Sequence, residues 1–149
     1  MSRADAAPNV ALRQDGGSFL IDTDALSELV RRPDGPVARH LARVGEENVF
    51  TSVIVAGELR FGAARSRSRT LAERVEGLLA HLAIAPIGPA AARTYATLRA
   101  HLAVAGTPIG PNDLWIAAHA LVLDATVVTR NVREFRRVPD LRVETWSDA

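Results

Sequence analysis

Residues 18–32 read SFLIDTDALSELVRR, a short apolar run that leads directly into a segment with helical periodicity. We expect a buried strand at residues 18–23 and a helix at residues 24–32, which the following Pro-Asp-Gly sequence ends. Asp22 closes the apolar run. In a parallel sheet, ligands bind outside the carboxyl ends of the strands, so this aspartate falls where a functional crevice is expected.

The same alternation of strands and helices continues through the chain. Further strands are expected at residues 49–52, 83–87 and 126–129, and residues 141–143 are a candidate fifth strand. Helices are expected at residues 36–44, 53–64, 70–82, 89–104 and 112–123, with a basic loop at residues 65–69. Strands that alternate with helices favour an α/β fold with a parallel sheet between two layers of helices.

Length and composition restrict the class of protein. A chain of 149 residues fits one domain with a single core. We expect a flexible extension at residues 1–17, which lack the apolar core of a signal peptide, and a folded domain at residues 18–149. No apolar run reaches the length of a transmembrane helix, so no membrane association is expected.

Two residue types are missing from the chain. The absence of Cys excludes disulfides, thiolate metal sites and cysteine nucleophiles, and it suits the reducing cytoplasm, where we expect the protein. The absence of Lys excludes mechanisms that need a catalytic amine. All 18 basic residues are therefore arginine, whose planar group suits phosphate and carboxylate. The net charge of +1 is not the strongly basic signature of a non-specific nucleic-acid binder.

Two acidic residues interrupt apolar helices. Asp113 begins the most apolar helix of the chain. Glu58 lies within a helix where its neighbours at three- and four-residue spacing are Ile54, Val55, Phe61 and Gly62. A helix face of this composition is expected to pack on the core, so we expect Glu58 to point inward.

Asp22, Glu58 and Asp113 are therefore three carboxylates in positions where apolar residues are expected. A buried carboxylate is costly unless it is paired or binds a metal. Three carboxylates that meet in one crevice repel one another, which raises their pKa values. A divalent cation removes this penalty, and oxygen ligands suit Mg²⁺ or Mn²⁺. The three residues together predict a metal site.

Each carboxylate also has a purely structural explanation. Asp22 and Asp24 could end the strand and cap the next helix, and Asp113 could form a helix cap with Asn112. Glu58 could instead pair with a buried arginine, such as Arg60 or Arg93.

A fourth contribution to the site is expected after the strand at residues 126–129, where Thr129, Asn131 and Glu134 are available. Asn131 could bind a metal or hold a water, and Glu134 could supply charge. The same residues could instead form a turn followed by a short helix.

In chain order, the sequence contains FLIDTDALSEL, TSVIVAGELRFGA and PNDLWIAAHALVLDATVVTRNVREFRRVPDLRVETW. These segments resemble the three signature regions of PIN-domain ribonucleases of the VapC toxin type, and the resemblance covers residues 18–146. It implies a PIN-like three-layer α/β/α fold with four or five parallel strands, dependence on Mg²⁺ or Mn²⁺, and cleavage of RNA. It also implies a VapBC-type toxin–antitoxin pair, in which the toxin inhibits translation, a cognate VapB-like antitoxin neutralises it, and the toxin forms a homodimer.

The resemblance places the acids of the family on Asp22, Glu58 and Asp113, and two supporting polar positions on Thr23 and Thr129. Two positions depart from the common pattern. An aspartate, Asp24, stands where Asn is common, and Asn131 stands where many PIN domains carry a fourth Asp. We therefore expect a three-carboxylate metal site, with the fourth catalytic position held by Asn131.

Four arginines lie where they could hold RNA phosphates, or could simply be solvated: Arg65, Arg67, Arg69 and Arg130. Two other functions compete with the nuclease. Asp22-Thr23-Asp24 after a strand also resembles the nucleophile motif of haloacid-dehalogenase-type phosphatases, although that chemistry normally uses a Lys. A non-catalytic PIN-like domain that binds only RNA or protein is the other alternative, and three inward carboxylates argue against it.

Overall fold

The computed structural model describes residues 17–148. The predicted extension at residues 1–17 lies, apart from Gly17, outside the described residues. Within them, no helix has both the length and the apolar character that crossing a membrane requires.

A five-stranded, fully parallel sheet forms the centre of the fold, in the order β3-β2-β1-β4-β5. The strands are β1 (Phe19–Ile21), β2 (Val49–Ser52), β3 (Ala83–Ala85), β4 (Thr126–Val128) and β5 (Val143–Glu144). The helices are α1 (Thr23–Arg31), α2 (Pro36–Val44), α3 (Val53–Ser66), α4 (Arg69–His81), α5 (Pro89–Val104), α6 (Pro111–Val122) and α7 (Val132–Phe135), with a short 3₁₀ helix, η2 (Glu46–Asn48).

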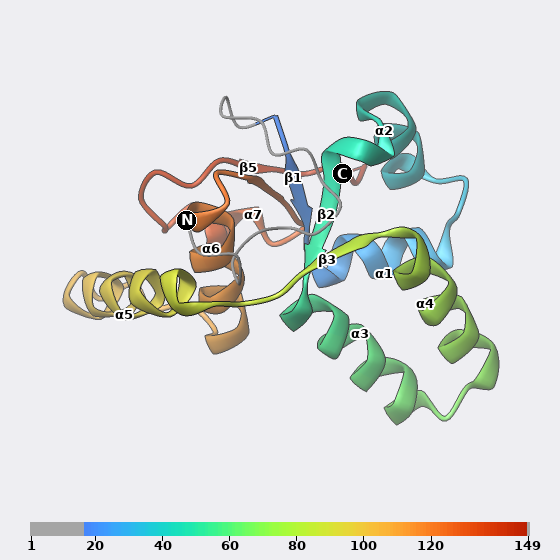
Figure 1. Cartoon of the computed structure of the whole chain (residues 1–149), viewed down its shortest axis with the longest axis horizontal. Helices are drawn as coiled ribbons and strands as arrows, with labels where there is room; N and C mark the ends of the chain where they lie inside the picture. The colour runs from blue at the N-terminus through green and yellow to red at the C-terminus, as the bar shows by residue number, and fades with distance from the viewer. Residues whose placement is uncertain (1–16, 149) are drawn as a thin grey trace.

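Helices cover both faces of the sheet, as the alternation of elements predicted. Figure 1 shows α5 and α6 on one side of the strands and α1, α3 and α4 on the other. This division follows from the strand order, because the chain moves from β1 to β2 and β3 and then returns past β1 to β4. Right-handed crossovers in opposite directions place their helices on opposite faces. The order reverses between β1 and β4, which is where such sheets bind ligands.

The core lies along the central strands. Leu20, Phe50 and Val127 are fully buried on β1, β2 and β4, since helices cover both faces. Helix α6 is almost entirely buried from Ile116 to Ala120, as its apolar composition predicted. Its first turn reaches the carboxyl end of the sheet and carries Asp113 there.

The predicted elements agree closely with the observed ones, but the basic loop at residues 65–69 is wrong. Arg65 belongs to the last turn of α3, and Arg69 is the first residue of α4. The hydroxyl of Ser68 accepts the Leu71 N–H at 3.1 Å and caps α4, so the helix begins earlier than its apolar spacing suggests. Only Arg67, in a left-handed conformation, and Ser68 connect the two helices.

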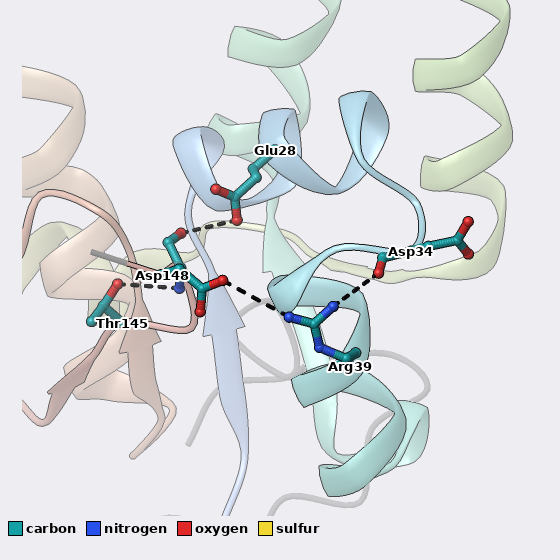
Figure 2. A network of polar contacts seen from close by, with 6 residues as sticks. Glu28, Asp34, Arg39, Thr145 and Asp148 are labelled. Carbon is teal, nitrogen blue, oxygen red and sulfur yellow. Dashed lines mark hydrogen bonds and ion pairs between the residues drawn. The ribbon is translucent and has the colours of Figure 1, made fainter.

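The C-terminal segment crosses back over β1 to the first helices. Trp146 is 3% exposed and packs on the rings of Phe19 and His40, at centroid distances of 5.3 and 5.2 Å. Figure 2 shows the polar contacts that follow it. The hydroxyl of Ser147 donates to the buried Glu28 at 3.0 Å, and Asp148 lies 3.9 Å from Arg39. These contacts fasten the chain end to α1 and α2.

Candidate metal centre

Asp22 lies directly after β1, at the carboxyl edge of the sheet, and is only 4% exposed. Its Oδ1 accepts the Thr23 N–H at 2.8 Å, so it caps α1 as the structural alternative proposed. Its Oδ2 accepts the hydroxyl of Thr129, at the end of β4, also at 2.8 Å. The cap uses one oxygen only, so the carboxylate can serve both roles.

Asp24 lies on the first turn of α1 and connects to the chain after β4. Its Oδ1 accepts the Arg130 N–H at 3.0 Å, and both of its oxygens lie 3.4 Å from the Thr129 hydroxyl. That hydroxyl accepts the Asn131 N–H at 2.9 Å. The residues after β1 and β4 therefore form one hydrogen-bonded unit at the point where the strand order reverses.

Glu58 reaches this unit from α3 and is half-buried. Its Oε1 accepts the Thr23 hydroxyl at 2.5 Å, and its Oε2 accepts the Asn112 amide at 3.1 Å. The suggested pairing of Glu58 with Arg60 is not observed, because Arg60 binds Glu76 on α4 with two hydrogen bonds of 2.9 Å.

Only part of the helix face around Glu58 packs on the core. Of the four neighbours that predicted an inward side chain, Phe61 is 64% exposed and Gly62 is also exposed, whereas the other two are buried or half-buried. The buried stripe runs from Val55 through Leu59 to Ala63, at four-residue spacing. Glu58 stands at the border of that stripe, which brings it to the site without burying it completely.

Asp113 lies on the first turn of α6, beside Asn131 and Glu134. The Asn131 amide donates to Asp113 Oδ2 at 3.3 Å and also donates to Glu134 Oε2. Glu134 Oε1 accepts the Gly110 N–H at 2.6 Å. Glu134 therefore satisfies the backbone at the beginning of α6, where Gly110 has no side chain to cap it. Residues 131–134 form the predicted turn and short helix and also contact the site.

The pKa values show that negative charge accumulates here. Burial, and then the charge of Asp24, raise the pKa of Asp22 from 3.8 to about 6, against hydrogen bonds that lower it. Burial, followed by the charges of Asp22, Glu134 and Glu58, raises the pKa of Asp113 to about 7. Burial raises the pKa of Glu134 as well, but the hydrogen bonds its carboxylate accepts outweigh this and leave its pKa below the usual value.

A cavity of about 540 Å³ opens at these residues. Four carboxylates line it: Asp22, Asp24, Glu58 and Asp113. Within residues 17–148, the ion pairs are Arg39–Asp148, Arg60–Glu76 and Arg142–Asp124. None of these pairs includes a carboxylate that lines the cavity. The predicted carboxylates thus meet in one place, and no arginine of the described chain forms an ion pair with them.

The donor chemistry fits a hard divalent cation. The side chains offer oxygen, and their raised pKa values show charge that a cation would stabilise. The described residues contain no group of three acidic, His or Cys side chains arranged to hold a metal as they stand. Glu58 is turned toward Thr23 and Asn112. Metal binding by Asp22, Glu58 and Asp113 stays a prediction, and it requires these side chains to leave some of their present partners.

The other predicted residues lie at different distances from the cavity. Asn131 and Arg130 line it, whereas Arg65 packs over Phe61, with its guanidinium carbon 5.7 Å from the ring centre. Arg67 and Arg69 lie at the far end of α3, and phosphate binding by all four arginines stays a prediction.

Two further residues, a partner of Glu58 and a residue of the cavity wall, were not predicted from the sequence. Asn112 binds Glu58, although its place next to Asp113 had suggested only a helix cap. Arg31 lines the cavity from the last turn of α1. Arg31 lies seven residues after Asp24, so the sequence alone places the two residues on one face of the helix.

Comparisons with known proteins identify the family of the chain. The PIN domain family model matches residues 19–141. Ribonuclease VapC2 of Rickettsia felis is 31% identical over 86% of this chain and 97% of its own length. The tRNA(fMet)-specific endonuclease VapC of Salmonella typhimurium is 35% identical over the same shares.

Solved structures show the same likeness. A chain in the crystal structure of VapBC2 from Rickettsia felis, bound to a DNA fragment from the promoter, superimposes with a TM-score of 0.81. It is 30% identical, over 87% of this chain and 98% of that one. DNA-bound VapBC from Salmonella typhimurium gives a TM-score of 0.78 at 32% identity, over the same shares. The chain therefore belongs to the PIN-domain family and, within it, to the VapC ribonucleases.

Proposed function

We propose that the protein is a Mg²⁺- or Mn²⁺-dependent endoribonuclease, the toxin of a type II toxin–antitoxin pair, which inhibits translation by cutting RNA. One observation carries the catalytic part of this proposal. Asp22, Glu58 and Asp113 come from three distant segments and line one cavity, where no arginine of the described chain forms an ion pair with them. Burial and mutual repulsion raise the pKa values of Asp22 and Asp113, an arrangement that costs stability unless a cation or a proton is bound.

Asp22, Glu58 and Asp113 would hold the ion. When bound, Mg²⁺ acts as a Lewis acid on the phosphate and lowers the pKa of an attacking water. Thr129 and the Thr23 N–H fix the orientation of the Asp22 carboxylate. With a pKa of about 7, Asp113 is partly protonated at neutral pH in the absence of a metal, and it would hold the ion as the ionised carboxylate.

Asn131 and Glu134 support Asp113 rather than replace it. The Asn131 amide donates to both carboxyl groups and so joins Glu134 to Asp113. Glu134 fixes the backbone of Gly110 and so sets the position of the first turn of α6. This division of roles explains how an amide can occupy the fourth position without removing the three-carboxylate site.

The substrate and partner follow from the relatives. Two relatives, 35% and 34% identical, are named tRNA(fMet)-specific endonucleases, so initiator tRNA is the first RNA to test. Similar solved chains come from VapBC complexes, which supports a VapB-like antitoxin as the partner. A homodimer and a cytoplasmic location stay predictions. The family match leaves no reason to retain the phosphatase alternative.

Incubation of the purified protein with initiator tRNA and with total RNA, in Mn²⁺ or Mg²⁺, tests the proposal. We expect internal cuts that EDTA prevents and that Asp113→Asn abolishes. Cleavage that survives EDTA would refute the metal mechanism. Calorimetry with Mn²⁺ tests the non-catalytic alternative, because a domain that only binds RNA or protein would take up no ion in this cavity.

A further inference from the structure

The cavity that contains the carboxylates has a second, apolar end. Helices α1, α3 and α4 form its walls, and they lie on the same side of the sheet (Figure 1). The side chains of this apolar end are aliphatic and belong to Val30, Leu59, Ala63, Leu71 and Val75. Gly62 lies among them, and Arg31 contributes the cation of this part of the cavity wall.

The two ends are connected along the helices. On α1, the cavity is lined first by Asp24, then by Ser27 and then by Arg31, which are spaced to share one face. The seven residues from the first to the last of these correspond to about 10 Å of helical rise. On α3, Gly62 lies one turn beyond Glu58. Apolar side chains follow the acids within one or two helical turns, with Val30 on α1 and Leu59 and Ala63 on α3.

A phosphodiester that is cut at the carboxylates carries a nucleoside on each side. One of these nucleosides must either enter the rest of the same cavity or leave it for solvent. A nucleobase is flat and uncharged, and its faces are apolar, so it suits aliphatic walls next to acids that would repel an anionic ligand. The whole cavity, at about 540 Å³, falls within the usual size range of small-molecule sites.

We infer that this apolar end of the cavity binds the base of a nucleotide adjacent to the cut phosphate, and so contributes to the choice of cleavage site. The inference rests on the proposed ribonuclease function. Unpaired bases in RNA loops are available for such insertion. Arg31 is exposed at the edge of the cavity, where its planar guanidinium can hold a phosphate or stack on the base.

The chain offers a matched pair of variants for the test. Gly62 lies inside α3, and an added Cβ would meet nothing within 4 Å, so Gly62→Leu fills the apolar end without displacing the fold. Gly77 lies inside α4, is equally open, and does not line the cavity, so Gly77→Leu is the control. Both changes replace a helical glycine with a good helix former.

The experiment uses an RNA hairpin whose cut site has been mapped, and copies of it with one abasic nucleotide on either side of that site. We expect the wild type and Gly77→Leu to lose about 10- to 100-fold in kcat/KM at one abasic position, as for other base contacts. Gly62→Leu should cut the intact RNA at this reduced rate and lose nothing more at the abasic position. The affinity for Mn²⁺, measured by calorimetry, should be equal in all three proteins, because the ion contacts no base.

Two results would overturn the inference. The first is a Gly62→Leu protein that cuts intact RNA as fast as the wild type. If that protein had also lost inhibition by the antitoxin, the apolar end would be assigned to a protein partner. The second is a Gly62→Leu protein that is still sensitive to the abasic change. If the wild type cut no RNA in Mn²⁺ or Mg²⁺, the proposed function itself would fail, and the inference with it.

Discussion

The hydroxyl of Thr129 donates a hydrogen bond to Asp22 Oδ2 at 2.8 Å and thereby joins the ends of the neighbouring strands β4 and β1. The other Asp22 oxygen accepts the Thr23 N–H at the same distance. The oxygen of Thr129 also accepts the Asn131 N–H at 2.9 Å, which orients its proton toward the acids. The buried carboxylate is therefore held in one orientation before any ligand arrives.

This relationship predicts the effect of Thr129→Val, which keeps the shape of the side chain and removes the hydrogen bond. We expect Mn²⁺ affinity to fall by about 10-fold or more, because groups that orient a metal ligand commonly contribute that much. Isothermal calorimetry measures it. Thr129→Ser retains the hydroxyl and should bind with nearly the wild-type affinity. Equal losses in the two variants would show that packing, and not the hydrogen bond, matters.

The raised pKa values predict how stability depends on pH in the absence of metal. Folded Asp22 and Asp113 hold their protons up to about pH 6 and 7, whereas both groups ionise near 3.8 in the unfolded chain. Between these pH values the folded protein therefore binds more protons than the unfolded chain does. The stability that this protonation contributes is complete below pH 3.8 and is lost as pH rises through 6 and 7.

In EDTA, the free energy of unfolding should consequently decrease between pH 5 and pH 7.5, with Asp22 contributing about 1 kcal/mol. Urea unfolding at a series of pH values measures this. Addition of Mn²⁺ at pH 7.5 should restore the lost stability, because the ion replaces the protons. A metal-free protein that is equally stable at both pH values would contradict the charge repulsion inferred for the cavity.

Asp113→Asn should separate stability from activity. The amide keeps an oxygen for the Asn131 hydrogen bond and removes a charge that Asp22, Glu134 and Glu58 repel. In EDTA at pH 7.5, we expect the Tm to rise by a few degrees while RNA cleavage is lost. At pH 5 the gain in Tm should disappear, because the wild-type carboxyl is then protonated. A variant that is less stable at pH 7.5 would indicate that the ionised carboxylate has a structural partner.

The strand ends were predictable because short-range patterns determine them. Asp22 ends an apolar run, and a parallel sheet then places it at a known edge. The bounds of α5 agree with the prediction at both ends, because Gly88 and Pro89 mark the start and the apolar spacing ends before Gly106.

The contacts within the site were not predictable in the same way. The bond between Thr23 and Glu58 joins residues 35 apart, and the bond between Asn112 and Glu58 joins residues 54 apart. Periodicity indicates that a helix has a buried face, but it does not say which neighbours flank that face. Its apolar context pointed to Glu58, which does line the cavity, although Phe61, one of the residues in that context, is exposed.

The C-terminal segment provides a prediction about stability alone. Trp146 is buried against Phe19 and His40, and the contacts drawn in Figure 2 hold the residues that follow it. Trp146→Ala removes this packing from the edge of the core. It should lower the free energy of unfolding by about 3–5 kcal/mol.

Ser147→Ala is a smaller change in the same segment and should destabilise the protein less. It deprives the buried Glu28 of its 3.0 Å hydrogen bond and should cost about 1–3 kcal/mol. Both losses are measured by urea unfolding. Where either variant remains folded, its Mn²⁺ affinity should equal that of the wild type, because Glu28 does not line the cavity that contains the carboxylates. A weaker Mn²⁺ affinity in folded Ser147→Ala would show that the chain end also positions α1, and with it Thr23 and Asp24, for the metal.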